Sequence, residues 1–207
     1  EVMTQGLNLT EGTTVSISTA QELKDLATYT NSGKNTKGVT FKLTQDITLN
    51  ENVINADKTF NEANASSFEE WEPIGYRTQL NTEDMNKQGI SNLGFSGIFD
   101  GQEHSIKGMY IYNDEGVGQN GEIYTKGLFG CIVEGVIKNV TIENSYVYTT
   151  TKGVGQLTGY MNGGLIDNCS TINGLVEGLA GAMAGICGYT AKGDFKNCYN
   201  SCDIITT

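Results

Sequence analysis

Glycine, asparagine and apolar residues recur every 29 positions in the last third of the chain, and this period constrains the fold most strongly. Six positions keep the spacing through three successive units without an insertion: Gly130/Gly159/Gly188, Gly135/Gly164/Gly193, Ile137/Ile166/Phe195, Asn139/Asn168/Asn197, Val140/Cys169/Cys198 and Val147/Val176/Ile205. A fixed period between about 20 and 50 residues is typical of solenoids, propellers and other repeat arrays. The pattern therefore predicts a stack of similar units.

Each unit has the composition of short strands and turns. In the first unit, the β-branched run Ile137–Ile142 follows glycine-rich turns, and no unit holds the apolar stripe of about 10–12 residues that a helix needs. Helical repeats of the ankyrin or tetratricopeptide kind, and leucine-rich repeats, are therefore disfavoured. We expect an all-β fold, a single-stranded, right-handed parallel β-helix (β-solenoid) with loop insertions.

The asparagine column is expected to bend each coil. Ile137 and Val140 are both apolar but three positions apart, so a continuous strand would place them on opposite faces. Asparagine tolerates the left-handed conformation that restores the alternation. Asn139, Asn168 and Asn197 are therefore predicted to form a structural ladder of stacked amides, in preference to a ligand site.

The neighbouring column predicts alternating charge. Lys138, Asp167 and Lys196 precede the three asparagines by one position each and should point outward. Opposite charges on adjacent strands favour this register by a few tenths of a kcal/mol.

Three segments follow from the pattern along the chain. Residues 1–50 are expected to hold an N-terminal cap, with a helix over 20–30 that begins at the capping box Thr19-Ala-Gln-Glu22, and a first coil. Residues 51–126 are expected to form irregular coils with polar insertions at 51–70, 76–94 and 113–126. Residues 127–207 should form three regular coils. The chain is expected to be a segment of a longer protein.

Composition excludes several classes of function. The net charge is −11, with 24 acidic and 13 basic side chains, so binding to nucleic acid is disfavoured. No apolar run approaches the length of about 18 residues that membrane insertion needs.

Cys169 and Cys198 stand one coil apart and are either a disulfide or a pair of buried thiols. With one histidine and no Cys-x-x-Cys pair, a zinc site is not expected.

The order of motifs resembles a known family. The turn Gly127–Gly130 followed by Gly-x-Ile-x-Asn is similar to the GLUG repeat. The motifs that usually precede GLUG repeats resemble four segments of this chain: Ala20–Ala27, Trp71–Gly75, Phe95–Gly101 and Ile106–Ile111. GLUG regions occur in bacterial cell-surface proteins, including IgA-specific metallopeptidases and adhesin-like proteins. The resemblance implies an extracellular or cell-surface location. The peptidase motif His-Glu-x-x-His is absent, so peptidase activity is not implied.

Two functions remain open. The chain is either a non-catalytic adhesion surface, ligand-binding surface or stalk, or a carbohydrate-active enzyme such as a pectate-lyase-like polysaccharide lyase or a glycoside hydrolase. A glycosidase needs two carboxylates about 5–10 Å apart. Acidic candidates are Asp100, Asp114, Glu115, Glu134, Asp167 and Asp194, and none stands in a catalytic motif. The sequence assigns no catalytic residue and favours the non-catalytic function, with glycans or host surface proteins as partners.

Tyrosines supply the candidate binding residues. Tyr160 and Tyr189 are 29 positions apart, so their rings should stack on one wall. They form either a platform for sugar rings or a packed structural pair. Tyr76 and Tyr124 lie in the nearby insertions and are further ligand-binding candidates.

A structural calcium ion is a weaker alternative, and no other cofactor is expected. Asp114 and Glu115 lie in an insertion rich in oxygen donors, the ligands that calcium prefers. The spacing matches no EF-hand loop, and acidic loops are usually only solvated.

Overall fold

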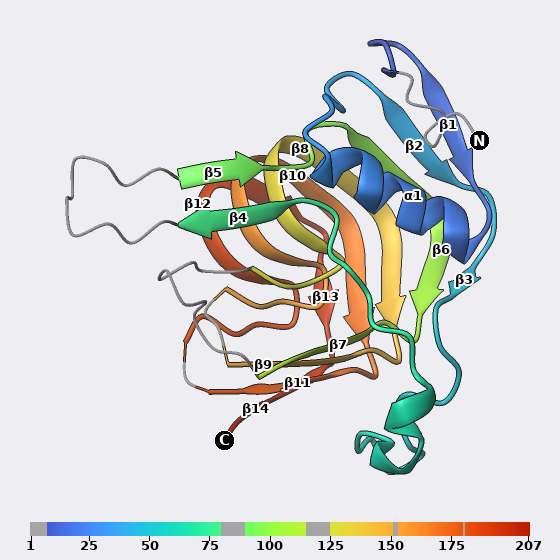
Figure 1. Cartoon of the computed structure of the whole chain (residues 1–207), viewed down its shortest axis with the longest axis vertical. Coiled ribbons are helices and arrows are strands. Elements are labelled where there is room, and N and C mark those ends of the chain that lie inside the picture. The colour runs from blue at the N-terminus through green and yellow to red at the C-terminus, as the bar shows by residue number, and fades with distance from the viewer. Residues whose placement is uncertain (1–7, 80–89, 115–124, 151–152, 180) are drawn as a thin grey trace.

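Two parallel sheets dominate the computed structural model, which describes residues 8–79, 90–114, 125–150, 153–179 and 181–207 (Figure 1). The larger, eight-stranded sheet has the order β1 (Thr14–Ile17), β2 (Thr40–Leu43), β6 (Ile98–Lys107), β8 (Phe129–Glu143), β10 (Thr158–Ile172) and β12 (Cys187–Lys196). In it, β3 (Ile47–Thr48) pairs with β6, and β13 (Tyr199–Asn200) pairs with β10. The smaller, four-stranded sheet has the order β14 (Asp203–Thr206), β11 (Leu175–Gly178), β9 (Tyr146–Thr149) and β7 (Tyr110–Asn113).

A hairpin and two helices complete the described chain. Strands β4 (Tyr76–Gln79) and β5 (Ile90–Leu93) pair antiparallel. Helix α1 spans Ala20–Asn31, where the sequence predicts a helix over 20–30, and Thr19 caps it by accepting a hydrogen bond from the Glu22 backbone nitrogen at 3.1 Å. A short 3-10 helix, η1, spans Glu62–Ser67. Neither helix of the described ranges is long and apolar enough to cross a bilayer.

The closed, all-parallel β-helix expected from the sequence is wrong. The strands form two separate parallel sheets and an antiparallel hairpin. Between the two parallel sheets, the described residues of the segments that a third wall would need contribute isolated bridges, Lys126 to Val154 and Val154 to Met183, and no named strand. Glycine weakens a strand because it has no side chain to pack, and Gly153 and Gly155 flank Val154. This side of the molecule is therefore a series of bridged turns.

Strand register in the larger sheet pairs residues 29 positions apart. Ile166 on β10 pairs with Ile137 on β8 and with Phe195 on β12. The same row continues to Phe99 on β6 and Phe41 on β2. Its first four members in space, from Phe41 to Ile166, are fully buried, whereas Phe195 is 41% exposed because β12 lies at the edge of the sheet. Phe195 therefore lies on the same face as Ile166 but is only partly covered.

The last strand departs from the 29-residue spacing. Val176 pairs with Val147, as the spacing predicts, but its other partner is Ile204 and not Ile205. Asn144 and Asn173 adopt the left-handed conformation before β9 and β11, with φ of 55° and 47°. The turn before β14 is one residue shorter, which shifts the register by one position.

Alternating charges line one face of the larger sheet. Asp167 pairs with Lys138 on one side and Lys196 on the other. The row continues from Lys138 to Asp100 and from Asp100 to Lys42. The alternation therefore spans five strands, and each strand meets an opposite charge in this row, which favours the register.

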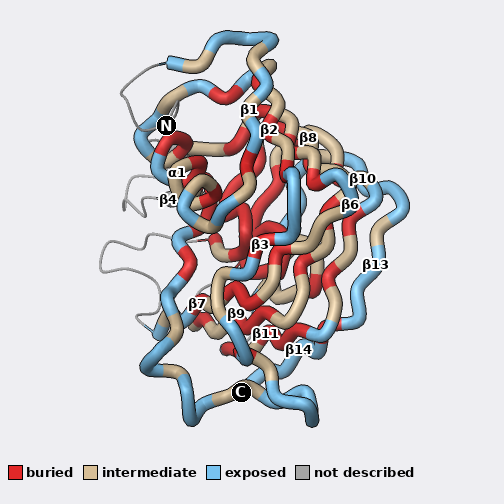
Figure 2. The backbone as a smooth tube through the Cα atoms, turned by 90° about the vertical axis from the view of Figure 1, so that its right-hand side faces the viewer, coloured by how far each residue is buried: buried red, intermediate tan, exposed pale blue. Residues whose placement is uncertain are grey.

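The core lies between the two parallel sheets. Phe41, Phe99 and Ile166 of the larger sheet share one apolar cluster with Ile111 and Val147 of the smaller sheet. Figure 2 shows the buried residues on the central strands and the exposed ones on β13 and the loops. Large exposed apolar side chains gather on the last strands: Tyr189, Phe195, Tyr199, Ile204 and Ile205.

All five cysteines carry free thiols, so Cys169 and Cys198 form no disulfide. Cys131 and Cys169 are buried in the core. Burial disfavours a thiolate and raises the pKa of both thiols to about 12 from an ordinary value of 9.0.

We expect these two thiols to make the fold sensitive to alkali. The folded state holds each proton to a higher pH than the unfolded chain does, so stability is complete below about pH 9 and falls as the pH rises towards about 12. From pH 8 to pH 10 the two thiols together should cost about 2.5–3 kcal/mol. Urea unfolding at the two pH values measures this loss in the wild type and in the Cys131→Ala, Cys169→Ala double variant. Between the two pH values, the free energy of unfolding of the double variant should fall less than that of the wild type, by the amount that the two thiols cost. Equal losses in the two proteins would contradict the raised pKa of the thiols.

Candidate ligand-binding surface

The two tyrosines that the sequence selects do stack, but one of them is buried. Tyr160 on β10 pairs with Tyr189 on β12, and their rings lie 8° from parallel with centroids 5.6 Å apart. The Arg77 guanidinium lies over the Tyr160 ring, with Cζ 4.0 Å from its centroid. We call these three residues the Tyr160 stack. Tyr160 is 4% exposed and Tyr189 is 51% exposed. Only Tyr189 therefore offers a ring to a ligand, so this pair is no two-ring platform.

The other two predicted tyrosines do not extend this stack. Tyr76 on β4 is half-buried and lines a separate cavity of about 280 Å³, together with Asn31 and Thr125. Tyr124 lies outside the described residues.

The asparagines of the predicted ladder adopt the left-handed conformation, with φ of 57°, 52° and 52° for Asn139, Asn168 and Asn197. The Asn168 Nδ2 donates to Asn139 Oδ1 at 3.0 Å, and the Asn139 Nδ2 donates to Asp100 Oδ1 at 3.0 Å. Asn197 departs from the ladder, since its Nδ2 donates to Asp167 Oδ1 at 3.1 Å. These amide side chains therefore link neighbouring strands where the chain bends.

The acidic candidates do not gather into one site. Asp114 is exposed after β7, and Glu115 lies outside the described residues. Asp100 also accepts a hydrogen bond from the Gln102 backbone nitrogen in a turn. Glu134 lies 3.6 Å from Lys192, measured from Oε1 to Nζ. Among the described residues, no three His, Cys, Asp or Glu side chains are grouped so that they could hold a metal ion.

A second tyrosine pair, which the 29-residue period does not predict, contains no buried ring. Tyr112 on β7 pairs with Tyr148 on β9, and their rings lie 16° from parallel with centroids 4.8 Å apart. We call this pair the Tyr112 stack. Tyr112 is 43% exposed, and β7 forms the edge of the smaller sheet. The two residues are 36 positions apart, so the 29-residue period does not reveal them.

Aromatic packing beside this pair holds the surface in place. One row away on the same face, Tyr110 and Tyr146 are covered by Phe60, whose centroid lies 3.7 Å from that of Tyr146 and 5.8 Å from that of Tyr110. Phe68 also packs against Tyr110, at 5.6 Å. The segment that carries η1 thus covers one row of rings and leaves the Tyr112 stack open. Burial and the Glu177 carboxylate, which accepts from the Tyr146 hydroxyl at 2.7 Å, raise the pKa of Tyr146.

Carboxylates surround the Tyr112 stack. Glu70 Oε1 accepts a hydrogen bond from the Tyr112 backbone nitrogen at 3.2 Å, so this carboxylate lies at the open edge of β7. Glu177 on β11 pairs with Tyr148 and flanks the other side of the stack. Partial burial raises the pKa of Tyr112, and the charges of Asp114 and Glu62 raise it further. The ring surface therefore lies in a negative field.

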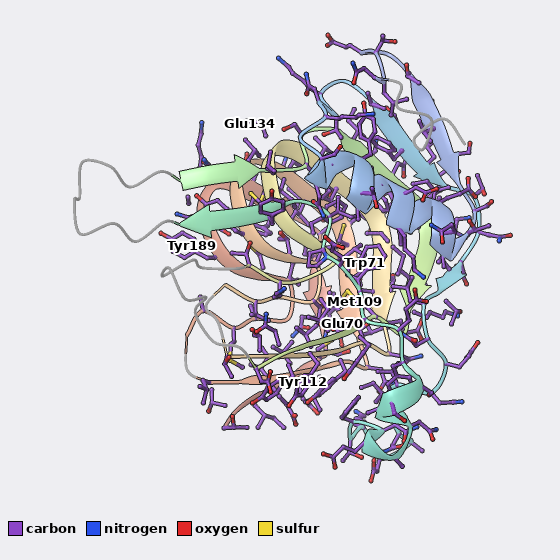
Figure 3. The ribbon with its side chains drawn as sticks, viewed as in Figure 1. Glu70, Trp71, Met109, Tyr112, Glu134 and Tyr189 are labelled. Carbon is purple, nitrogen blue, oxygen red and sulfur yellow. The ribbon has the colours of Figure 1, made fainter. Side chains whose placement is uncertain are left out.

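Figure 3 separates this surface from the Tyr160 stack. Tyr112 lies on the smaller sheet with Glu70 in the segment beside it, whereas Tyr189 and Glu134 lie on the side of the larger sheet. Substitutions at these two places can therefore be compared as independent changes.

Comparison with known proteins shows similarity in fold. No family model matches the chain, and no curated protein matches it. A similar solved structure is that of a putative immunoglobulin A1 protease from Bacteroides ovatus, with a TM-score of 0.55 and 21% sequence identity. The match covers 97% of this chain and 50% of that protein, so the chain spans about half its length. The similarity establishes that the two share a β-rich fold.

Proposed function

We propose that the chain is a non-catalytic binding module of a secreted or cell-surface bacterial protein, and that the Tyr112 stack contacts the ligand. The observation that carries the proposal is an accessible, preordered ring on an edge strand. Tyr112 is 43% exposed, while its neighbours Tyr110 and Tyr146 are packed beneath Phe60. A ring that is ordered before binding loses little conformational entropy when a ligand covers it.

The cellular context of the proposal rests on resemblance. The motif order from Trp71–Gly75 to Gly127–Gly130 resembles the GLUG-repeat regions of bacterial surface proteins. The similar fold in a Bacteroides protein supports a bacterial setting. An extracellular module of this kind would meet glycans or host surface proteins, and adhesion is the corresponding role.

No specific observation favours the alternative of a carbohydrate-active enzyme. Such an enzyme needs two carboxylates that face one substrate bond. Asp100, Glu134 and Asp167 instead engage a turn, a lysine and an asparagine of the sheets. We therefore propose binding without turnover.

Replacing Tyr112 by alanine should abolish or strongly weaken binding. The proposal predicts at least a tenfold loss of affinity, which corresponds to roughly 1.4 kcal/mol, for whichever glycan or host surface protein the wild type binds. A glycan array and a panel of purified host surface proteins identify the ligand, and calorimetry measures the loss. Tyr189→Ala is the matched control, since it removes an exposed tyrosine on the larger sheet.

Two outcomes would contradict the proposal. Binding that survives Tyr112→Ala but disappears in Tyr189→Ala would move the site to the Tyr160 stack. A wild type that binds no member of either panel would make the chain a stalk. Melting temperatures of both variants show that the fold is kept, as expected for residues that are about half exposed.

A further inference from the structure

We propose that the Tyr112 stack selects among saccharides by charge: it takes a pyranose ring with neutral or amino substituents and rejects rings that carry carboxylate or sulfate. This inference rests on the proposed function and adds the chemical class of the ligand. It follows from the shape of the ring surface and from the charges around it.

The shape of the surface suits a sugar ring. Tyr148 stacks on one face of Tyr112 at 4.8 Å, and β7 has no strand beyond it in the smaller sheet. Tyr112 is 43% exposed, so part of its ring surface is open to a ligand. A pyranose has an apolar face of C–H groups, and this face packs flat on an aromatic ring.

The polar groups around the ring are hydrogen-bond acceptors. Glu70 uses Oε1 to accept from the Tyr112 backbone, and the rest of this exposed carboxylate faces solvent beside the ring. Glu177 lies beyond Tyr148, away from Tyr112, and accepts from the Tyr146 hydroxyl, so Glu70 is the acceptor on the Tyr112 side of the stack. Sugar hydroxyls and amines donate hydrogen bonds, and an ionised carboxylate is a strong acceptor for them.

Carboxylates near the Tyr112 stack also oppose anionic ligands. Asp114 and Glu62 both act on the Tyr112 hydroxyl as negative charges, and Glu70 acts on Tyr110 in the same way. The chain as a whole carries a net charge of −11. A sugar acid placed on the ring would therefore bring a like charge close to several carboxylates, which weakens its binding and slows its approach.

Three oligosaccharides that share glucosamine-derived rings separate shape from charge. Chitotriose is neutral, its fully deacetylated form is cationic at pH 6, and a hyaluronan tetrasaccharide carries carboxylates. Calorimetry or ligand-observed NMR at low salt measures their affinities for the wild type. We expect the deacetylated trimer to bind at least as tightly as chitotriose, and hyaluronan to bind at least tenfold more weakly than chitotriose.

Two carboxylate variants test the origin of the selectivity. Glu70→Gln keeps an oxygen that can accept from the Tyr112 backbone and removes the charge. It should therefore reduce the difference in affinity between chitotriose and hyaluronan, the affinity gap, about threefold. Glu134→Gln changes the net charge equally but lies away from the site, and it should leave the gap unchanged (Figure 3). Raising the salt concentration should narrow the gap as well, because exposed charges are screened.

The outcomes separate this inference from the proposed function. Hyaluronan binding that equals chitotriose binding and still requires Tyr112 would overturn the charge selectivity and leave the binding module in place. A lysine-rich peptide that binds through Tyr112 and Glu70, while none of the three saccharides binds, would replace the saccharide with a basic protein segment. Loss of every Tyr112-dependent interaction, with any probe, would overturn the proposed function itself.

Discussion

Replacing Ile166 by aspartate should unfold the chain. Ile166 is fully buried on β10, a central strand of the larger sheet, between Ile137 and Phe195. An unpaired carboxylate in this position costs several kcal/mol, which is comparable with the whole stability of a domain, about 5–15 kcal/mol. Far-UV circular dichroism and urea unfolding measure the loss.

Phe195→Asp is the matched control for this substitution. Phe195 belongs to the same row of paired residues but is 41% exposed on the edge strand β12. Its replacement should cost about 1 kcal/mol or less, as for other partly exposed positions. If the two variants unfolded at the same urea concentration, or if Ile166→Asp remained folded, the core would not lie where the register places it.

Replacing Gly108 by alanine should be the second most damaging change. Gly108 has a φ of 73°, and a Cβ there would overlap the backbone oxygen of Asn50. The turn cannot move freely, because the Gly108 nitrogen donates to the Glu143 oxygen at 2.9 Å and its oxygen accepts from Asn50 Nδ2 at 3.0 Å. We expect a loss of about 3 kcal/mol or more from the strained conformation and the overlap together.

Gly12→Ala separates these two contributions. Gly12 has a φ of 89°, but nothing lies within 4 Å of the position that a Cβ would occupy. Its replacement should therefore show the conformational cost alone, about 1–2 kcal/mol. Thermal and urea unfolding of the two variants measure the difference. Equal losses would mean that the close approach to Asn50 contributes nothing.

The register within the last units was predictable because its signals are local. An apolar residue, a charged residue and a left-handed asparagine recur together, so a slip by one residue would bury charges and expose apolar side chains. The pairing of Ile137 with Ile166 follows from that pattern. Where a local signal is missing, the prediction fails. The turn before β14 lacks the asparagine found at positions 144 and 173, and β14 is shifted by one residue.

The closed β-helix failed as a prediction for a different reason. A period shows that similar units stack, but it does not show that each side of a unit forms a continuous sheet. The side that includes Gly153, Val154 and Gly155 forms isolated bridges because glycine packs poorly in a strand. Within the insertion predicted at 76–94, β4 and β5 pair antiparallel, which the period of the later units cannot reveal.

The sequence by itself determined the helix at 20–30 and the 29-residue register of β8, β10 and β12, because short-range pattern and backbone preference decide them. The Tyr112 stack was decided by tertiary structure alone. Tyr112 and Tyr148 are 36 positions apart, and they meet because β7 pairs with β9 at the edge of the smaller sheet. Tyr160 and Tyr189 keep the period, yet Arg77 from a distant hairpin covers Tyr160. Whether a ring is open to a ligand depends on which segment of the folded chain packs over it, and periodicity carries no information about that contact.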